Sequence, residues 1–180
     1  MTNDSDSDIQ DDDEEIGNVS HIFAGYADGT IKKWDVKQGN CVLHIEKQTK
    51  KEIKSQGPCY IWTLKKYKGY LISGDSKGEI SIWDDNFGTL VKKFNQLQGD
   101  ILTMEINPVF DCLYATGVDS RVVSIALSSS VDEDGTSGPE EWVLSSIYRG
   151  QSHDIKSLVM LGKNSLISGG ITTDICFYKL

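Results

Sequence analysis

At two places in this chain a glycine stands nine residues ahead of a Trp-Asp pair. Gly25 precedes Trp34-Asp35, Gly74 precedes Trp83-Asp84, and the residues between align without a gap. Self-similarity of this kind constrains the fold strongly, because each repeat forms one unit that can bury its apolar face only against its neighbours. We therefore expect a repeat protein.

Two weaker copies follow in the same frame, beginning at Thr116-Gly117 and at Ser168-Gly169. A branched residue stands six positions after each of the four glycines, namely Ile31, Ile80, Val123 and Ile175. Successive glycines lie 49, 43 and 52 residues apart, roughly the length of one four-stranded propeller blade. In this frame Ala126 and Tyr178 take the place of the tryptophan in the third and fourth copies.

Alternating apolar and polar residues predict β-strands in every copy. The strands are expected at residues 61–65, 101–106 and 155–161, and again at 41–45, 90–94 and 142–148. Asp28-Gly29 and Lys77-Gly78 are suited to hairpin turns that require a positive backbone φ. No segment shows a convincing helical period, so the sequence predicts an all-β fold.

These copies resemble the WD-repeat family, whose members fold as β-propellers. The resemblance implies about four blades, near residues 19–46, 59–95, 100–148 and 153–180. The first blade lacks a clear first strand and the last ends after its third. We therefore expect a propeller that is incomplete at both ends, with its ring completed by further chain or by a partner.

The family resemblance also implies structural roles for particular residues. The repeat positions are Asp28, Trp34, Asp35, Trp83, Asp84, His153 and Ser168. His153 is expected to be a structural histidine that hydrogen-bonds toward Ser168, although Thr172 stands where the repeat usually has an aspartate. Trp62 and Trp142 lie in expected strands, so we expect all four tryptophans in the core, with base stacking as the weaker alternative.

Charge is distributed unevenly along the chain. The net charge is −9, and residues 1–15 hold eight acids and no base, which leaves 19 acids against 18 bases in the remainder. Residues 1–18 cannot bury enough apolar surface to offset their ordering entropy, so this acidic tail is expected to be disordered. It either keeps the protein soluble or contacts basic proteins and competes with nucleic acid. Ser5, which lies among acids, is a possible site for an acidophilic kinase.

Lysines dominate one internal stretch. Residues 46–68 hold two acids and seven lysines, at positions 47, 50, 51, 54, 65, 66 and 68. Lys47, Lys50, Lys51 and Lys54 belong to the long connection between the first two blades and are the candidate contacts to RNA phosphates or to an acidic partner. An ordinary solvated loop is the alternative. A second long connection, residues 128–141, is expected to be mobile.

No constellation of catalytic residues is visible. The four cysteines and three histidines have neither metal-ligand nor nucleophile spacing, and no glycine-rich stretch fits a phosphate loop. We therefore expect no catalytic residues, no cofactor and no metal. No run of about 20 apolar residues predicts a membrane span, and the dispersed cysteines fit a reducing compartment.

Several segments give a narrower resemblance within the WD repeats. They are Cys59-Tyr-Ile-Trp-Thr-Leu, Leu71-Ile-Ser-Gly-Asp-Ser-Lys-Gly-Glu-Ile-Ser-Ile-Trp-Asp, Tyr114-Ala-Thr-Gly-Val-Asp-Ser-Arg-Val and His153-Asp-Ile-Lys-Ser-Leu. Over roughly residues 19–180 the chain is similar to the cirhin family of tandem-propeller proteins. The resemblance implies a noncatalytic nucleolar or nuclear scaffold of the small-subunit processome, which acts in ribosomal RNA transcription and processing. Its expected partners are other processome proteins and, through phosphate contacts, precursor ribosomal RNA. The alternative is a WD-repeat substrate receptor or adaptor in ubiquitin ligation or signalling, in the cytoplasm.

Overall fold

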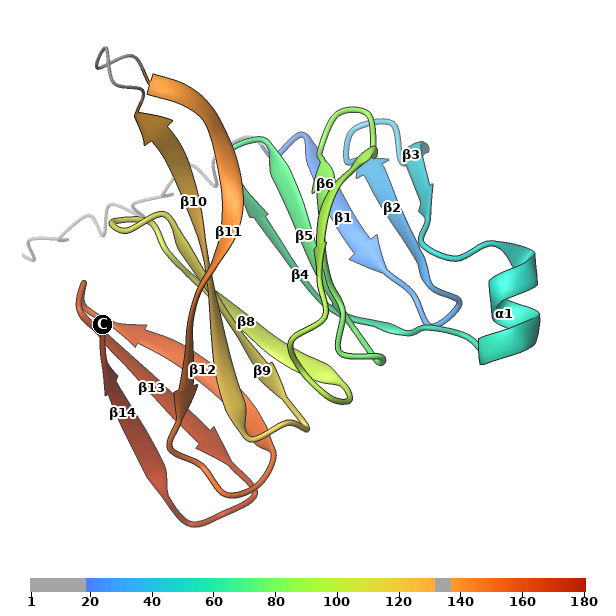
Figure 1. Ribbon diagram of the computed structural model, residues 1–180. Helices are drawn as coiled ribbons and strands as arrows, with labels where there is room; N and C mark the ends of the chain where they lie inside the picture. Colours follow the sequence, from blue (N-terminus) through green and yellow to red (C-terminus); the bar gives the residue numbers. More distant parts are fainter. Residues whose placement is uncertain (1–18, 132–136) are drawn as a thin grey trace, which may run out of the picture.

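Four antiparallel β-sheets follow one another along the chain (Figure 1). The computed structural model describes residues 19–131 and 137–180. The acidic tail of residues 1–18, with Ser5, therefore lies outside the described residues. We number the sheets as blades 1 to 4. The expected all-β architecture of about four propeller blades, incomplete at both ends, is confirmed.

Blades 1 and 4 have three strands each, and blades 2 and 3 have four. Blade 1 contains β1 (His21–Gly25), β2 (Thr30–Asp35) and β3 (Cys41–Glu46). Blade 2 contains β4 (Ile61–Tyr67), β5 (Tyr70–Asp75), β6 (Ile80–Asp84) and β7 (Leu90–Phe94). Blade 3 contains β8 (Ile101–Asn107), β9 (Cys112–Gly117), β10 (Arg121–Val131) and β11 (Ser137–Arg149). Blade 4 contains β12 (Ile155–Leu161), β13 (Ser165–Gly170) and β14 (Ile175–Lys179).

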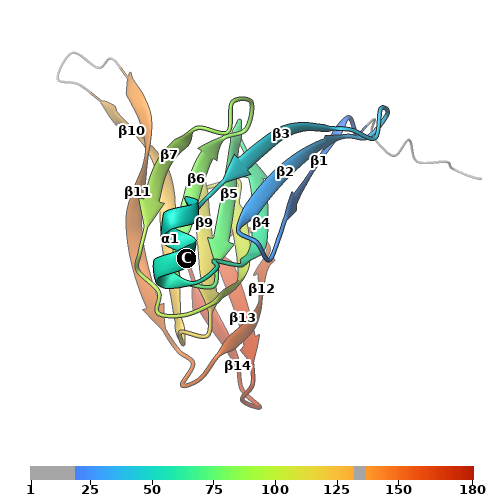
Figure 2. The ribbon, with the colours of Figure 1, turned by 90° about the vertical axis from the view of Figure 1, so that its right-hand side faces the viewer.

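The blades converge on one side, because β4, β8 and β12, the first strands of their sheets, lie in contact in that order. Figure 2 shows the sheets from the side that carries α1, with β12, β13 and β14 below the other blades. Within each blade the strands pair with their sequence neighbours, so the connections alternate between two rims of the molecule. One rim carries α1 (Lys50–Gln56) and the β1–β2 and β5–β6 turns, and the other carries the β2–β3 and β4–β5 turns.

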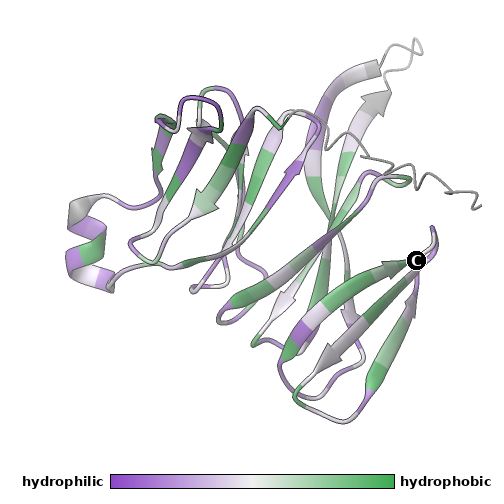
Figure 3. Ribbon diagram, turned by 180° about the vertical axis from the view of Figure 1, so that it is seen from behind, coloured by the Kyte–Doolittle hydropathy of each residue, from purple (hydrophilic) through white to green (hydrophobic). Residues whose placement is uncertain are grey.

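Three buried apolar clusters hold neighbouring blades together. Trp83 and Leu71 pack with Ile31 and Ile45 between blades 1 and 2. A larger cluster lies between blades 2 and 3, and a third, which includes Tyr114 and Leu158, lies between blades 3 and 4. Each junction thus buries the apolar side chains of two neighbouring sheets, and Figure 3 shows where hydrophobic residues lie along their strands.

Two of the repeat glycines, Gly25 and Gly74, lie where one blade comes very close to the next. A Cβ atom on Gly25 would lie 2.5 Å from Cγ2 of Ile61, and one on Gly74 would lie 2.6 Å from Cγ2 of Ile101. Both isoleucines open the first strand of the next blade. Glycine is therefore required at these positions because a side chain would push the neighbouring blade away.

The strand register corrects our alignment of the third copy by one residue. In blade 2, Leu64 of the first strand pairs with Ser73, and Leu71 pairs with Trp83. In blade 3, Met104 pairs with Ala115, and Leu113 pairs with Ile125. Ala115 therefore matches Ser73 and Ile125 matches Trp83, so the tryptophan position belongs to Ile125 and not to Ala126. The spacing between equivalent residues of the second and third strands is the same in the two blades, so the whole third copy shifts by one residue, and Gly117 takes the position of Asp75 and not that of Gly74.

A short helix, α1, contradicts the expectation that no segment is helical. Thr49 caps it, because its hydroxyl accepts a hydrogen bond from the backbone N–H of Glu52 while the Glu52 carboxylate accepts one from the N–H of Thr49. Gly57 ends the helix with a φ of 74°. This reciprocal capping box was visible in the sequence as Thr-x-x-Glu. Seven residues are too few to show an apolar period.

The connection in blade 3 is also more ordered than expected. Strands β10 and β11 extend to Val131 and from Ser137, and they pair from Arg121 with Arg149 to Val131 with Ser137. Residues 128–141 therefore belong mostly to a long β-ribbon, and only residues 132–136 lie outside the described part of the chain. The sequence did not predict this strand pairing because the segment is rich in polar residues, which are typical of loops.

Candidate functional site

Each blade has a cluster of side chains around the residue at the repeat tryptophan position, which we call its hub. In the blade 2 hub, the indole Nε1 of Trp83 donates a hydrogen bond of 3.0 Å to the hydroxyl of Ser73. Both residues are buried. The bond fixes the indole of β6 to β5 and satisfies a buried donor that would otherwise be costly.

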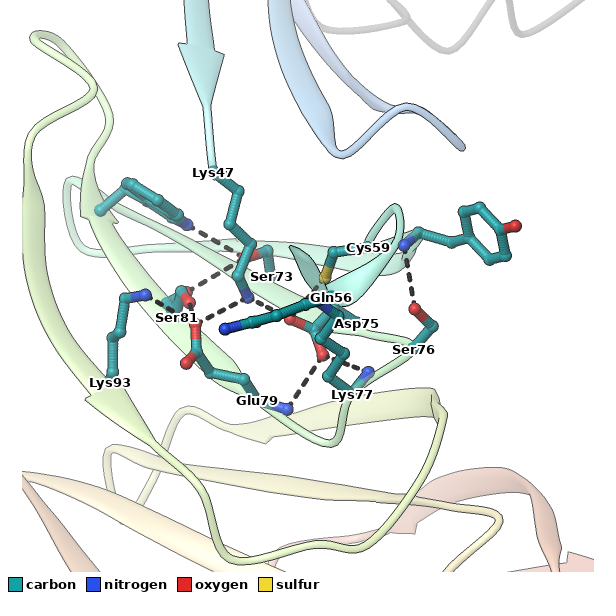
Figure 4. Close-up of polar contacts among 12 residues, drawn as sticks. Lys47, Gln56, Cys59, Ser73, Asp75, Ser76, Lys77, Glu79, Ser81 and Lys93 are labelled. Atoms are coloured by element: carbon teal, nitrogen blue, oxygen red, sulfur yellow. Dashed lines mark hydrogen bonds and ion pairs between the residues drawn. The ribbon is translucent and has the colours of Figure 1, made fainter. Parts of the chain in front are cut away.

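An ion pair lies beside this bond (Figure 4). Lys47, just after β3 in blade 1, reaches the carboxylate of Asp75 at the end of β5, and their side chains are only 3% and 1% exposed. Asp75 also accepts hydrogen bonds from the thiol of Cys59 at 3.1 Å and from the backbone N–H groups of Lys77 and Glu79 at 2.8 and 3.0 Å. The carboxylate therefore joins blade 1, the blade 1–2 connection and the β5–β6 turn.

Glu79 completes the charge balance of the blade 2 hub. Its carboxylate lies 3.0 Å from Nζ of Lys47 and 2.9 Å from Nζ of Lys93, and it accepts a hydrogen bond of 3.0 Å from Ser81. Burial is the largest single influence and raises the pKa of both carboxyls, but the charge of Lys47 and the hydrogen bonds that each carboxylate accepts together outweigh it. They hold the pKa of Asp75 and that of Glu79 below their ordinary values. Both groups are consequently ionised at neutral pH.

The same burial makes the Cys59 thiol unreactive. Desolvation, reinforced by the hydrogen bond to Asp75, raises the pKa of Cys59 to about 12. A nucleophilic cysteine must be a thiolate at working pH, so this thiol serves as a hydrogen-bond donor within the hub.

The blade 4 hub has the same geometry without charge. The hydroxyl groups of Ser168 and Tyr178 lie 3.1 Å apart, and Nε2 of Gln151 donates to the Ser168 hydroxyl at 3.4 Å. Thr172 donates to Oε1 of Gln151 at 3.0 Å. Gln151, not His153, therefore occupies the position beside Ser168. His153 is exposed, and its Nδ1 lies 2.8 Å from the Ser152 hydroxyl. Motif spacing favoured His153, but the turn before β12 brings in the residue two positions earlier.

The other two hubs lack this polar chain. In blade 3 the matching residues are Ile125, Ala115 and Leu97, which lie in one buried apolar cluster. In blade 1 the indole of Trp34 is only partly buried, and its Nε1 donates to the Tyr26 hydroxyl at 3.3 Å.

The repeat aspartates stabilise turns. Asp28 accepts hydrogen bonds from the backbone N–H and the hydroxyl of Thr30 at 3.0 and 2.7 Å. Asp35 accepts from the N–H groups of two following residues in the β2–β3 turn, and Asp84 does the same in the β6–β7 turn. These carboxylates replace backbone partners in the way that Asx turns do.

The structure separates the lysines that the sequence groups together. Lys47 is buried in the blade 2 hub, so it is not available to a phosphate. Near the opposite rim the three lysines of the β4–β5 hairpin each pair with an acid: Lys65 with Glu105, Lys66 with Asp85 and Lys68 with Asp111. Lys51 and Lys54 lie exposed on α1 and form no salt bridge with another described residue. The side chain of Lys50, which opens α1, lies outside the described part of the chain.

Trp62 also differs from its expected core position, because it is 50% exposed. It is the extra residue of a β-bulge, since Ile61 pairs with Asp75 and Thr63 already pairs with Gly74. The bulge turns the indole outward, where it meets Tyr60 edge to face with ring centroids 5.8 Å apart. Trp142, in contrast, is 2% exposed and contacts Tyr70 edge to face.

Within residues 19–131 and 137–180, no group of three or more His, Cys, Asp or Glu side chains is arranged to hold a metal ion. None of the helices in the same part of the chain is long and apolar enough to cross a bilayer.

Comparison with known proteins gives consistent results for fold and ancestry. A chain in a crystal structure of the mitotic checkpoint complex superimposes with a TM-score of 0.68 at 16% identity, over 89% of this chain and 44% of that one. U3 small nucleolar RNA-associated protein 4 of Schizosaccharomyces pombe is 29% identical over 84% of this chain and 21% of its own length. The homolog from Homo sapiens is 28% identical over 89% of this chain and 23% of its own length. No protein-family model matches the chain.

The sheets and the structural match show that this chain has the fold of a partial WD-repeat propeller. The chain is related to U3 small nucleolar RNA-associated protein 4, and it spans less than a quarter of the length of these relatives.

Proposed function

We propose that this chain is a noncatalytic scaffold of the small-subunit processome, the particle that processes small-subunit ribosomal RNA. The observation that carries the proposal is the relationship to U3 small nucleolar RNA-associated protein 4, which extends over 84 to 89% of the chain. We also propose a nucleolar location, other processome proteins as partners, and completion of the ring by further chain or by a partner.

The arrangement of charge supports a scaffold that relies on protein contacts more than on RNA contacts. Most lysines of the basic stretch are paired within or between blades. Within that stretch, Lys51 and Lys54 on α1 are exposed and form no salt bridge with another described residue. Two phosphate contacts give weak, salt-sensitive binding that does not depend on sequence. RNA contact through α1 therefore supplements binding that the protein neighbours dominate.

Purification of the tagged chain from nuclei at two salt concentrations tests this function. The proposal predicts recovery of processome proteins together with U3 small nucleolar RNA and precursor ribosomal RNA. Recovery of a ubiquitin-ligase or signalling complex without these RNAs would instead establish the adaptor alternative, which the exposed Tyr60–Trp62 pair makes worth testing.

Two charge-reversal substitutions on α1 test its contribution to RNA binding separately from the contacts with protein partners. The double variant Lys51→Glu and Lys54→Glu should reduce RNA recovery at low salt while protein partners are retained. Its matched control is Lys37→Glu and Lys163→Glu, because these exposed lysines lie in the β2–β3 and β12–β13 turns of the opposite rim. Equal loss of RNA in both double variants would show that net charge, and not α1, controls the contact.

A further inference from the structure

An open hollow of about 400 Å³ lies on the rim that carries α1, beside the β9–β10 turn of blade 3 (Figure 1). It is lined by Gln98, Val118, Asp119, Ser120, Arg121 and Arg149. Blade 3 lies between two described blades, so the hollow does not depend on either end of the chain. Val118 is the one apolar residue among the six that line it. The hollow therefore suits a polar ligand.

Asp119 fixes one wall of this hollow. Its Oδ1 accepts a hydrogen bond of 2.8 Å from Nε of Arg121, and its Oδ2 pairs with a terminal nitrogen of the same guanidinium. The carboxylate also accepts the backbone N–H of Gln98 at 3.0 Å and that of Arg121 at 3.1 Å. The side chain of Asp119 is only 10% exposed. Asp119 thus ties the β9–β10 turn to the connection between blades 2 and 3, and it holds Arg121 in one orientation.

Arg149, at the end of β11, brings a second positive charge without a second acid. It pairs directly with Arg121 across the β10–β11 ladder, and like charges in opposite positions of a ladder are destabilising. Arg149 is exposed and forms no salt bridge with another described residue. Hydrogen bonds from Arg121 hold the pKa of Asp119 below its ordinary value, so this carboxylate is ionised. Two guanidinium groups against one carboxylate leave one positive charge in the hollow.

We propose that this hollow is a binding site for one backbone phosphate of RNA. The guanidinium of Arg149 donates to the phosphate oxygens as a fork, and the Ser120 hydroxyl and the Gln98 amide supply further donors from the same hollow. The phosphate lowers the repulsion between the two arginines. A phosphodiester carries one negative charge and balances the hollow, whereas a phosphoserine carries about −1.5 to −2 and exceeds it.

This inference rests on the proposed function, because precursor ribosomal RNA is the RNA that such a scaffold meets. The hollow and α1 lie on the same rim (Figure 1), so an RNA strand that follows this rim can contact both. Phosphate contacts fix the position of a nucleic acid without reading its sequence. The hollow would therefore set the path of the RNA across blade 3, and we expect no preference for particular bases.

Binding of a fluorescently labelled single-stranded oligouridine to the purified 180-residue chain tests the site. Arg149→Gln should weaken binding about threefold to tenfold at low salt and lower the slope of log K against log salt concentration by about 0.7, the loss of one phosphate contact. The control Lys37→Gln removes the same charge from an exposed lysine of the opposite rim and should change neither quantity. Equal losses in the two variants, or no loss in Arg149→Gln, would overturn the proposal.

Two further measurements test the chemistry of the site. Arg149→Lys keeps the charge but loses the planar fork, so it should retain the salt slope of the unaltered chain and bind less tightly. A lysine variant with the low slope of Arg149→Gln would contradict a phosphate contact made through charge. A phosphoserine peptide is the second probe. If it binds more tightly than oligouridine and Arg149→Gln abolishes its binding, the site belongs to a phosphorylated protein and the proposal fails.

Purification of the tagged Arg149→Gln chain from nuclei separates this site from the proposed function. The site predicts that processome proteins are recovered as with the unaltered chain, while recovery of precursor ribosomal RNA at raised salt falls. Unchanged recovery of RNA would overturn the site and leave the scaffold function standing. Failure of the unaltered chain to recover processome proteins would overturn the function itself, so the two failures are distinguishable.

Discussion

The hubs of blades 2 and 4 share one packing arrangement but differ in the polar groups that surround it. Both place an aromatic residue of the third strand against a serine of the second, as Trp83 with Ser73 and Tyr178 with Ser168. Blade 2 adds the buried ion pair of Lys47 and Asp75, whereas blade 4 adds the neutral amide of Gln151. The comparison shows that a hub with the same aromatic–serine contact can be built with or without charge, and the apolar hub of blade 3 shows that the fold requires only that the hub be filled.

The two hubs should lose different amounts of stability when one polar partner is removed. Removing a neutral hydrogen-bonding partner costs roughly 1 kcal/mol. Removing one member of a buried ion pair costs about 3–5 kcal/mol, since the other charge stays buried without its partner. Blade 2 is therefore the junction most sensitive to single substitutions.

The largest expected effect comes from Lys47→Met, which keeps much of the side-chain length but deletes the charge. It should lower the free energy of unfolding by about 3–5 kcal/mol. Gln151→Met, the equivalent change in the neutral hub, should cost about 1 kcal/mol. Chemical denaturation of both variants measures the difference. Similar losses would mean that the charge of Lys47 has no special role.

A smaller effect distinguishes the two serines. Ser73→Ala leaves the buried Nε1 of Trp83 without an acceptor and should cost about 1–3 kcal/mol. Ser168→Ala should cost about 1 kcal/mol or less, because the hydroxyl of Tyr178 can rotate toward another acceptor. Thermal unfolding of the two variants provides the comparison, and a larger loss for Ser168→Ala would reverse our ranking of the hubs.

Acid should weaken the blade 2 hub selectively. The pKa values of Asp75 and Glu79 are lowered from their ordinary values of 3.8 and 4.5, so the folded state binds fewer protons than the unfolded state. Their stabilisation is complete above those ordinary values and is lost as the pH falls toward the lower values of the folded state. The pH dependence of unfolding should be shallower in Lys47→Met than in Gln151→Met between about pH 4.5 and 3. Parallel pH-dependence curves for the two variants would show that Lys47 does not cause the lowered pKa values of Asp75 and Glu79.

The smallest effect on stability is expected at Lys51 and Lys54, two of the lysines that the sequence indicated as candidate partner contacts. Lys51→Glu and Lys54→Glu should change the free energy of unfolding by less than about 0.5 kcal/mol, because both side chains are exposed. Denaturation of the double variant checks this. A loss above about 1 kcal/mol would show that α1 has a structural role that its exposed lysines do not reveal.

Sequence reasoning recovered the strands and the blade number because the repeats fix both. It placed the tryptophan of blade 2 correctly for the same reason, since Trp83 stands at the repeat position and is buried. It misaligned blade 3 by one residue, because it matched Gly117 to Gly74, whereas the strand register matches Gly117 to Asp75 and moves the hub residue from Ala126 to Ile125. A shift of one residue leaves no signal here because Ile125 and Ala126 are both apolar.

The hub partners were harder to predict because they come from distant segments. Lys47 and Asp75 are 28 residues apart, and the run of lysines around Lys47 resembled a solvated surface. Gln151 was hidden by the more conspicuous histidine two positions later. The exposure of Trp62 was not predicted, because the alternation of apolar and polar residues assigns a strand residue to a face but does not reveal a β-bulge.

A double-mutant cycle between Lys47 and Asp75 tests most directly whether this lysine belongs to the scaffold and not to its binding surface. The variants are Lys47→Met, Asp75→Asn and their combination, and asparagine keeps the acceptor for the β5–β6 turn. We predict a coupling free energy of about 2 kcal/mol or more, with the double variant losing much less than the two single variants together. A coupling below about 0.5 kcal/mol would contradict the account and return Lys47 to the candidate partner contacts.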